Sequence, residues 1–326
     1  MRVRLAIRHI TMEIRKFTEA DEDGIRSLFA LCFGKELSHE EWSWKYKGSP
    51  WGGTAVVAVD GEEIIAHYGG LRMKFRYQDR TFEVFQPCDV MTHPKFRARI
   101  FSKKGAMVRA GEYFYATNPM DFAFGFPSER HAILGTRQLG YTEHSYVEVL
   151  RREVSWVSPS WNLLPKVEVG WDAIDATELD ALCADVRDNS CLSIEKNSSY
   201  IFWRYRDNPG KQYLPLIVRS RYGRRLRAFA VLSFGVSGLS ILDFFCEKTL
   251  RERIILRIFE RIASAHDLGS ITLWVNPEGA LIKTLIKEGF LRGKGVPYIF
   301  KVMNNTIKPA FLFHNYCYRM GDYDAS

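Results

Sequence analysis

The sequence contains no long apolar run. Its longest apolar stretches, such as residues 228–234, have the length of a strand and are too short for a helix that crosses a bilayer. The N-terminal segment MRVRLAIRHITMEIRKF is basic, but polar and apolar residues alternate in it. It lacks the apolar block and small-residue cleavage site of a secretory signal. We therefore expect no membrane span and a cytoplasmic location.

Cysteine is sparse and scattered. The chain has six cysteines and no C-x-x-C pair, which argues against a zinc site of the usual spacing and against a dense disulfide framework. Reduced thiols and no bound metal are the simplest interpretation. The six residues are Cys32, Cys88, Cys183, Cys191, Cys246 and Cys317.

Several catalytic signatures are also missing. The sequence has no G-x-S-x-G, no G-x-x-x-x-G-K-[ST] and no H-E-x-x-H, so it does not match α/β-hydrolases, P-loop enzymes or zinc proteases. The net charge of +8 indicates either an anionic partner, such as a phosphate-bearing cofactor, or an ordinary basic surface. Because the basic clusters at residues 97–104 and 219–227 are short, we expect no nucleic-acid partner.

The sequence does contain an internal repeat. Residues 44–50, WKYKGSP, reappear as residues 203–209, WRYRDNP, and both fit the pattern Trp-basic-Tyr-x-x-x-Pro. Each copy is followed by two apolar runs about a Gly-bearing turn. Each unit also ends on a helical stretch, a glycine and an aromatic residue, at Gly140-Tyr141 and Gly289-Phe290. We interpret this as a duplication, in which the repeated motif is most simply a structural cap.

The chain of 326 residues, 46% of them hydrophobic, has enough material for two cores. We expect an N-terminal domain at 1–150, a linker at 151–171, a C-terminal domain at 172–303 and an aromatic-rich tail at 304–326 that packs on a domain. In the first unit the patterns predict strands at 14–17, 55–59, 64–75, 82–91 and 121–126, and helices at 19–32, 42–46, 101–113 and 128–139. In the second unit they predict strands at 214–218, 227–234, 240–246, 271–275 and 297–302, and helices at 177–188, 198–206, 251–266 and 279–288.

The most informative segment is VFQPCDVMTHPKFRARIFS, residues 84–102. A strand runs into His93-Pro94 and then into a basic stretch that opens a helix. Free backbone N–H groups at a helix N-terminus bind anions, and Arg97, Arg99 and the two lysines that follow would add positive charge. The segment predicts an anion-binding turn; a solvated basic helix start is the alternative.

With these motifs and this order of elements, the sequence resembles the GNAT superfamily of acyl-CoA-dependent N-acetyltransferases. Within it, the sequence is similar to tandem proteins that carry two such domains in one chain. The resemblance covers about residues 13–302. It implies an α/β fold (α+β mixed sheet) made of two consecutive GNAT-like acyl-CoA N-acyltransferase domains. It further implies acetyl-CoA, or another acyl-CoA, as co-substrate. The partner implied is a small-molecule primary amine that attacks directly in a ternary complex.

The resemblance also assigns cofactor-binding residues. In the family, the strand before the loop splays and its backbone binds the pantetheine arm and the acyl carbonyl, while the loop wraps the pyrophosphate. The matching strand residues are Val90, Met91 and Thr92, and the matching loop residues are Arg97, Ala98, Arg99, Ile100, Phe101 and Ser102.

Two departures from the family pattern bear on activity. The loop glycine expected after Arg99 is missing, and glycine is what lets a backbone approach a phosphate closely. Many family members carry a tyrosine on the last helix that protonates the departing thiolate. Here that position holds Thr136 and, in the second unit, Leu285. The remaining candidates for this role are Tyr141, Tyr113, Tyr115 or a water.

Amine acetylation also needs a group that takes a proton from the ammonium. Glu83 lies at the start of the same strand, and Asp89 follows within it, whereas His93 is more simply a turn residue. The resulting catalytic candidates are Glu83, Asp89 and Tyr141. In the second unit, residues 244–251 occupy the loop position without a glycine, so we expect that unit to be non-catalytic.

Two other functions stay open. A protein that keeps the fold without turnover would be a binding module for an acyl-CoA or a partner protein. Enzymes that add aminoacyl groups to peptidoglycan precursors also pair two GNAT-like domains, but the sequence lacks their long helical arm. The acceptor amine and the oligomeric state, a homo-oligomer included, are left open.

Overall fold

The computed structural model of the protein describes residues 12–99, 105–154, 165–220, 225–236, 238–250, 252–276 and 280–323. Within these ranges, no helix is both long and apolar enough to cross a membrane. The first half contains β1 (Glu13–Lys16), α1 (Glu22–Phe33), α2 (His39–Tyr46), β2 (Gly53–Asp60), β3 (Glu63–Tyr77), β4 (Arg80–Thr92), α3 (Ala106–Thr117), β5 (Phe122–Gly125), α4 (Glu129–Leu139) and β6 (Ser145–Glu153). The second half contains β7 (Lys166–Val169), α5 (Ala176–Asp185), β8 (Ser193–Ile194), α6 (Ser198–Ile201), β9 (Leu214–Arg219), β10 (Leu226–Phe234), β11 (Gly238–Cys246), α7 (Glu252–Ala265), β12 (Ser270–Val275), α8 (Ala280–Lys287), β13 (Leu291–Val302) and α9 (Pro309–Asn315).

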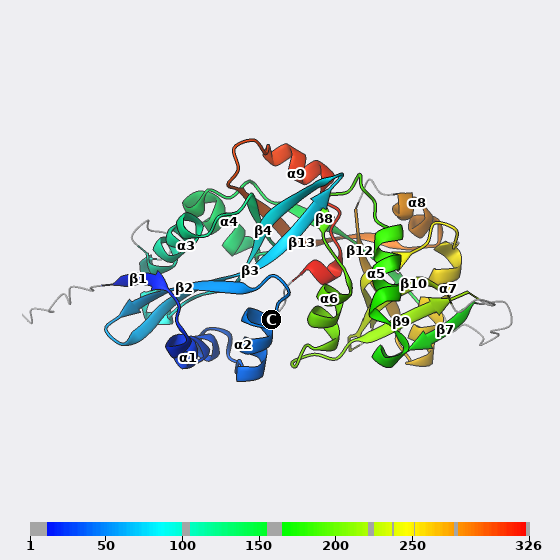
Figure 1. Cartoon of the computed structure of the whole chain (residues 1–326), viewed down its shortest axis with the longest axis horizontal. Coiled ribbons are helices and arrows are strands. Elements are labelled where there is room, and N and C mark those ends of the chain that lie inside the picture. Colours follow the sequence, from blue (N-terminus) through cyan, green and yellow to red (C-terminus); the bar gives the residue numbers. More distant parts are fainter. Residues whose placement is uncertain are drawn as a thin grey trace, which may run out of the picture.

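The described strands form one hydrogen-bonded path that runs through both units (Figure 1). Their order is β1-β2-β3-β4-β5-β13-β6-β12-β11-β10-β9-β7, and the short β8 pairs with β3. The order is symmetric about its centre. Strands β1 to β6 of the first unit correspond, in chain order, to β7 and β9 to β13 of the second unit. In the centre, β13 pairs antiparallel with β5 and β6 pairs antiparallel with β12. The two units therefore exchange their last strands, and neither sheet is complete without the other half of the chain.

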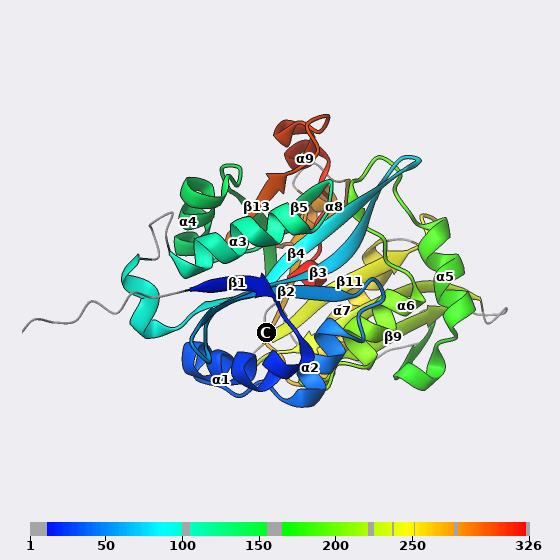
Figure 2. The same cartoon turned by 60° about the vertical axis from the view of Figure 1, so that its left-hand side comes forward.

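Helices cover both faces of the first unit. α3 and α4 lie on one face of its strands, and α1 and α2 lie on the other (Figure 2). α1 is amphipathic and buries Ile25, Leu28 and Phe29 on one face. The largest core cluster contains residues of both units, among them Trp42 and Trp203, so the units share one core.

The two copies of the repeated motif meet in this shared core. The rings of Trp44 and Trp203 are stacked, with centroids 5.3 Å apart and an interplanar angle of 21°. Trp44 Nε1 donates to the Trp203 carbonyl oxygen at 2.6 Å, and Trp203 Nε1 donates to the Trp44 carbonyl oxygen at 2.8 Å. Such reciprocal contacts are what a two-fold relation produces, so the duplication in the sequence is a pseudo-two-fold in the fold.

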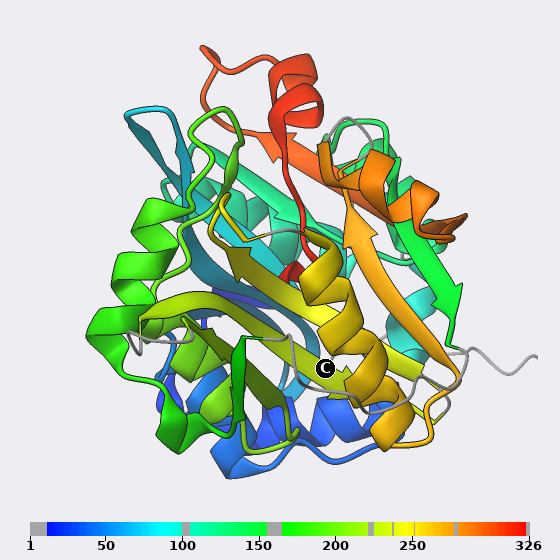
Figure 3. The ribbon, with the colours of Figure 1, turned by 90° about the vertical axis from the view of Figure 1, so that its right-hand side faces the viewer.

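The tail after β13 packs on the molecule, as expected. We call residues 316–323 the C-terminal strap; after α9 it runs into the middle of the molecule (Figure 3). Cys317 in the strap is joined to Cys191 by a disulfide, so the prediction of reduced thiols is wrong for this pair. The physical reason is a long-range pairing: Leu192 N donates to Asn315 O at 2.8 Å and Cys317 N donates to Leu192 O at 2.9 Å. The free cysteines of the described residues are Cys32, Cys88, Cys183 and Cys246.

The expected strands and helices are present, with ends shifted by a few residues, but the short β8 and α9 were not predicted, and larger differences concern β6, β7, α3 and β13. β6 and β7 were not predicted, and both enter residues 145–171, of which 155–164 lie outside the described part. α3 begins at Ala106 and not at residue 101, because a 3-10 helix at Pro94–Arg99 follows β4. β13 begins at Leu291, six residues earlier than predicted. The proposed domain boundaries stay a prediction.

Candidate active site

The candidate site lies where two neighbouring parallel strands separate. β4 and β5 are paired only at Val84–Phe122 and Phe85–Ala123. Beyond Phe85, β4 continues to Thr92 against β3, and its other edge has no pairing with β5. Pro87 stands at this opening, and a proline is tolerated within a strand where its missing N–H is not required by a ladder. The opening therefore exposes backbone groups of β4 to a ligand.

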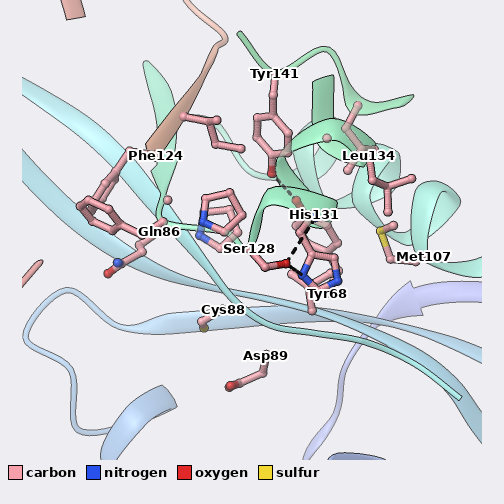
Figure 4. A pocket seen from close by; sticks show the side chains of 18 of the residues that line it. Tyr68, Gln86, Cys88, Asp89, Met107, Phe124, Ser128, His131, Leu134 and Tyr141 are labelled. Carbon is pink, nitrogen blue, oxygen red and sulfur yellow. Dashed lines mark hydrogen bonds between the residues drawn. The ribbon is translucent and has the colours of Figure 1, made fainter. Parts of the chain in front are cut away.

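A cavity of about 340 Å³ fills this opening (Figure 4). Its walls come from β4, from the end of β5 and from α4, with Phe33 of α1 on the opposite side of the sheet and Tyr323 of the strap. The cavity thus reaches both faces of the first unit's sheet. Its lining residues are Phe33, Tyr68, Gln86, Pro87, Cys88, Asp89, Val90, Met107, Phe124, Gly125, Phe126, Pro127, Ser128, His131, Leu134, Gly135, Leu139, Tyr141, Ile299 and Tyr323.

Asp89 holds an irregularity in β4 at this point. The β3–β4 register shifts between His67 and Gly69, and Asp89 has a φ of 49°, in the left-handed region that non-glycine residues rarely adopt. Lys45 Nζ donates to Asp89 Oδ1 at 2.9 Å, and Tyr46 OH donates to Asp89 Oδ2 at 2.7 Å. All three side chains are buried. The repeated motif therefore supplies the two partners that fix the bulge.

This arrangement changes the expected role of Asp89. Its carboxylate points away from Tyr141 and His131 (Figure 4) and is paired with a buried ammonium group. The Lys45 ammonium group, 2.9 Å from Asp89 Oδ1, occupies the carboxylate from the side away from the cavity. The geometry therefore supports a positioning role for Asp89, in which it shapes the open edge of β4.

Three tyrosine hydroxyl groups meet at the wall of the cavity. Tyr141 OH lies 2.5 Å from Tyr68 OH and also forms a hydrogen bond with Tyr115 OH, while Tyr68 OH and Tyr115 OH are 2.9 Å apart. Gly135 of α4 makes room for this, since a Cβ there would lie 2.0 Å from the Tyr141 ring. Thr136, the next residue, instead donates to the Ala132 and Thr142 carbonyl oxygens. The Tyr141 ring therefore packs against α4 at Gly135, next to the position at which the family tyrosine was expected.

The mouth of the cavity carries positive charge. Ser128 caps α4, and its hydroxyl lies 3.3 Å from His131 Nδ1. The pKa of His131 is lowered, first by partial desolvation and then by the charges of Arg130 and Arg97. Arg97 is exposed and donates through Nε to the Thr92 carbonyl oxygen at 3.0 Å. This mouth suits an anionic group.

The structure brings only some of the predicted residues together. Asp89, Val90 and Tyr141 line the cavity, whereas Met91 and Thr92 are buried beside it in β4. Glu83 is exposed, lies 3.9 Å from Lys74 Nζ and does not line the cavity. Arg97, Ala98 and Arg99 belong to the 3-10 helix ahead of α3, while Ile100, Phe101 and Ser102 lie outside the described residues.

Sequence reasoning missed three features of the site. His131 was passed over because a single histidine on a helix carries no motif. Tyr68 was missed because it lies within an apolar strand. Gly105 is the N-cap of α3, with φ −69° and ψ 142°, and so provides a glycine at the helix start that had been sought directly after Arg99. The signal is weak, because Gly105 lies well beyond the end of β4 at Thr92.

The second unit has a corresponding opening with different contents. β11 pairs with β12 from Gly238 to Ile241 and then separates from it, beside a cavity of about 730 Å³. The C-terminal strap lies against this part of β11, since a Cβ at Gly321 would lie 2.7 Å from an Asp243 carboxylate oxygen. Asn276, after β12, donates to the Tyr316 carbonyl oxygen at 3.3 Å. The strap therefore spans the second opening.

Charged side chains are paired with one another at this second opening. Lys196 Nζ pairs with Asp243 and, at 2.6 Å, with Asp322 of the strap. Burial alone would lower the pKa of Lys196, but the two carboxylates outweigh it and the pKa is raised. In the turn after β11, the Glu247 carboxylate lies 2.7 Å from Arg225 and 3.2 Å from Arg227. Both arginines at this turn are therefore already paired with a carboxylate.

Comparison with known proteins agrees with this architecture. Residues 13–143 match the family model of the acetyltransferase (GNAT) domain. A probable N-acyltransferase from Enterococcus faecalis V583 has a TM-score of 0.68 at 11% identity, over 90% of this chain and 73% of that chain. A GCN5-related N-acetyltransferase from Kribbella flavida has a TM-score of 0.63 at 13% identity, over 90% of this chain and 71% of that chain.

A tandem GNAT protein from the clavulanic acid biosynthesis pathway has a TM-score of 0.56 at 9% identity, over 89% of this chain and 98% of that chain. A search of curated protein sequences found no match. The chain therefore has the fold of two GNAT-like domains in tandem. Its N-terminal unit, residues 13–143, belongs to the GNAT acetyltransferase domain family.

Proposed function

We propose that the protein is an N-acetyltransferase that moves an acetyl group, or another acyl group, from acyl-CoA to a primary amine of a small molecule. The observation that carries this proposal is the open β4–β5 cleft with a tyrosine hydroxyl in its wall. On this proposal, residues 1–150 bind the acyl-CoA, and residues 172–303 shape the site without catalysing. A cytoplasmic location and the oligomeric state stay predictions.

The residues of the first cleft fit an acyl-CoA. The free edge of β4 can pair with the amide groups of an extended pantetheine arm, as strand edges pair with peptides. Arg97 and the N-terminus of α3 at Gly105 lie on the side from which a pyrophosphate would be held. Met107, Leu134 and Leu139 provide an apolar wall for the arm.

The chain's own groups then divide the work. A bound thioester supplies an electrophilic carbonyl group, which the amine attacks directly. Backbone N–H groups at the β4 bulge, fixed by Asp89, stabilise the developing oxyanion. His131, kept neutral by its lowered pKa, accepts the proton from the amine. Tyr141 donates its hydroxyl proton to the departing sulfur.

Titration calorimetry and a thiol-release assay test this proposal. Full-length protein is expected to bind CoA and to release CoA from acetyl-CoA when an amine from a broad panel is added. Tyr141→Phe should lower the rate on the order of 100-fold. Tyr113, also a candidate from the sequence, is exposed on α3 and does not line the cavity, so Tyr113→Phe is the matched control and should keep the rate. CoA binding without transfer to any amine would favour the binding module instead, and no CoA binding at millimolar ligand would contradict both.

A further inference from the structure

The three tyrosines at the cavity wall come from different parts of the first unit. Tyr68 lies on β3, Tyr115 on α3, and Tyr141 directly after the left-handed C-cap of α4 at Gly140. Tyr68 and Tyr115 are 1% and 6% exposed, and Tyr141 and Tyr68 line the cavity. Three elements thus converge on one point, where Tyr141 and Tyr68 line the cavity and Tyr115 lies behind them (Figure 4).

The distances make Tyr141 the centre of this group. Its hydroxyl is bonded to both neighbours, and both of these contacts are shorter than the 2.9 Å between Tyr68 OH and Tyr115 OH. A phenolate accepts hydrogen bonds and cannot donate them, and hydrogen bonds to a charged group are stronger than neutral ones. Loss of the Tyr141 proton is therefore compensated by two O–H donors that are already in place.

The ordering of acidity follows from the same contacts. Burial raises the pKa of all three hydroxyl groups, but on Tyr141 the hydrogen bonds from Tyr115 and Tyr68 act in the opposite direction. For Tyr115, in contrast, the interactions with Tyr141 and Tyr68 raise the pKa further. Tyr141 is accordingly the group of the three that gives up its proton most readily.

We propose that Tyr68 and Tyr115 are positioning residues that orient Tyr141 as the proton donor and stabilise the phenolate it leaves behind. This inference rests on the proposed function. As the carbon–sulfur bond breaks, its electron pair stays on sulfur, and the Tyr141 hydroxyl proton moves to that sulfur. The Tyr141 phenolate then accepts hydrogen bonds from the O–H groups of Tyr68 and Tyr115. A proton taken up from solvent restores the Tyr141 hydroxyl group and balances the proton that the amine released.

Other ionisable groups near the three tyrosines must be kept constant in a test. Lys301, on the exchanged strand β13, places Nζ 4.9 Å from the Tyr115 ring centroid and donates to the Leu139 carbonyl oxygen at 2.5 Å. Burial lowers the pKa of Lys301 and the charge of Glu112 on α3 opposes this shift, while Cys88 on β4 adds to the rise that burial causes in the pKa of Tyr68. Because Lys301 belongs to the second unit, the exchanged strand also supports this site.

A double-mutant cycle on the full-length protein tests the kinetic part. Tyr68→Phe and Tyr115→Phe should each lower kcat about 10- to 100-fold, with the KM for acetyl-CoA within about twofold of wild type. In the Tyr141→Phe background either change should have no further effect, because the three act as one unit. Tyr113→Phe again serves as the control. Independent, multiplicative effects of the three substitutions would overturn the proposal.

Titration of the tyrosinate absorbance tests the structural part without any substrate. The difference between wild type and Tyr141→Phe gives the titration of Tyr141, and this step should move to higher pH in Tyr68→Phe and in Tyr115→Phe. An unmoved step in both variants would overturn the proposal, even if both lost activity through a general disturbance. Should wild type transfer no acyl group at all, the proposed function fails, while a shifted step would still establish the stabilised phenolate.

Discussion

The two openings of the sheet follow one plan but differ in what occupies them. In both, two parallel strands pair briefly and then separate, and in both a tyrosine of the repeated motif, Tyr46 or Tyr205, donates to a buried aspartate of the longer strand. In the first unit the strand edge faces a cavity with the Tyr141 hydroxyl. In the second unit the C-terminal strap lies along it and Lys196 joins two carboxylates.

This difference shows how a duplicated fold keeps its architecture while the two copies place different groups along the separated strands. The contacts that hold the units together are symmetric, as in the Trp44–Trp203 pair. The contacts that decide access are not symmetric, because the strap is a single segment and can cover only one of the two openings. It ends at the first cleft, where Tyr323 lines the cavity and Gln86 Nε2 donates to the Asp322 carbonyl oxygen at 2.7 Å.

The largest expected effect concerns Gly135. Gly135→Ala should lower acyl transfer on the order of 100-fold or more, because the new Cβ would displace the Tyr141 ring and remove the proton donor from the site. Thr284→Ala, at the corresponding position of α8 in the second unit, is the control and should leave the rate unchanged. Steady-state kinetics of both variants measure this. Equal losses of rate in the two variants would contradict the difference between the units.

The next largest effects are expected from substitution of the two buried lysines, Lys196 and Lys45, which should lower the free energy of unfolding. Lys196→Met should lower the free energy of unfolding by about 3–5 kcal/mol and Lys45→Met by somewhat less, because Lys196 leaves two unpaired carboxylates and Lys45 leaves one. Urea titrations followed by circular dichroism measure this. Lys47→Met, at a surface position within the motif, should change stability by at most about 0.5 kcal/mol. A larger loss for Lys45→Met than for Lys196→Met would reverse the comparison.

Opening the Cys191–Cys317 disulfide should have a smaller effect. The double variant Cys191→Ser/Cys317→Ser is expected to lose about 2–4 kcal/mol, because the bond closes a loop of 126 residues and fixes the strap in the second opening. Wild-type protein in a dithiol reductant should unfold at the same denaturant concentration as the double variant without it. Identical midpoints for oxidised and reduced wild type would show that the strap is held by its other contacts alone.

The smallest expected effect lies at the pseudo-two-fold. Trp44→Phe and Trp203→Phe should each cost about 1 kcal/mol, since each removes one indole N–H donor from a partly buried carbonyl. The two changes should be coupled, because the stacked rings touch. Strictly additive changes in the free energy of unfolding would show that the two copies do not depend on each other.

The sequence predicts local elements and the duplication better than it predicts long-range pairing. The repeated motif indicated two units, and the helix-glycine-aromatic endings placed Tyr141 at the end of α4. The exchange of β6 and β13 has no local signal, because each strand pairs with residues more than a hundred positions away. The same holds for Cys191 and Cys317, since spacing alone does not fix which cysteines pair.

The site shows the same limit. Asp89 was selected as an acid or base because of its chemical type, but its partners Lys45 and Tyr46 come from a distant helix and turn it away from the cavity. Tyr141 was selected for want of a helix tyrosine, whereas the reason for its placement, Gly135, becomes visible only in three dimensions. Residue types could be read from the sequence, but the contacts that assign their roles could not.

Hydrogen–deuterium exchange of the full-length protein, with and without CoA, tests the asymmetry between the two openings most directly. We expect CoA to protect the backbone of residues 86–90 in β4 and 105–108 at the start of α3, and to leave residues 243–250 of the second opening unchanged. Protection at residues 243–250 without protection at 86–90 would contradict this expectation.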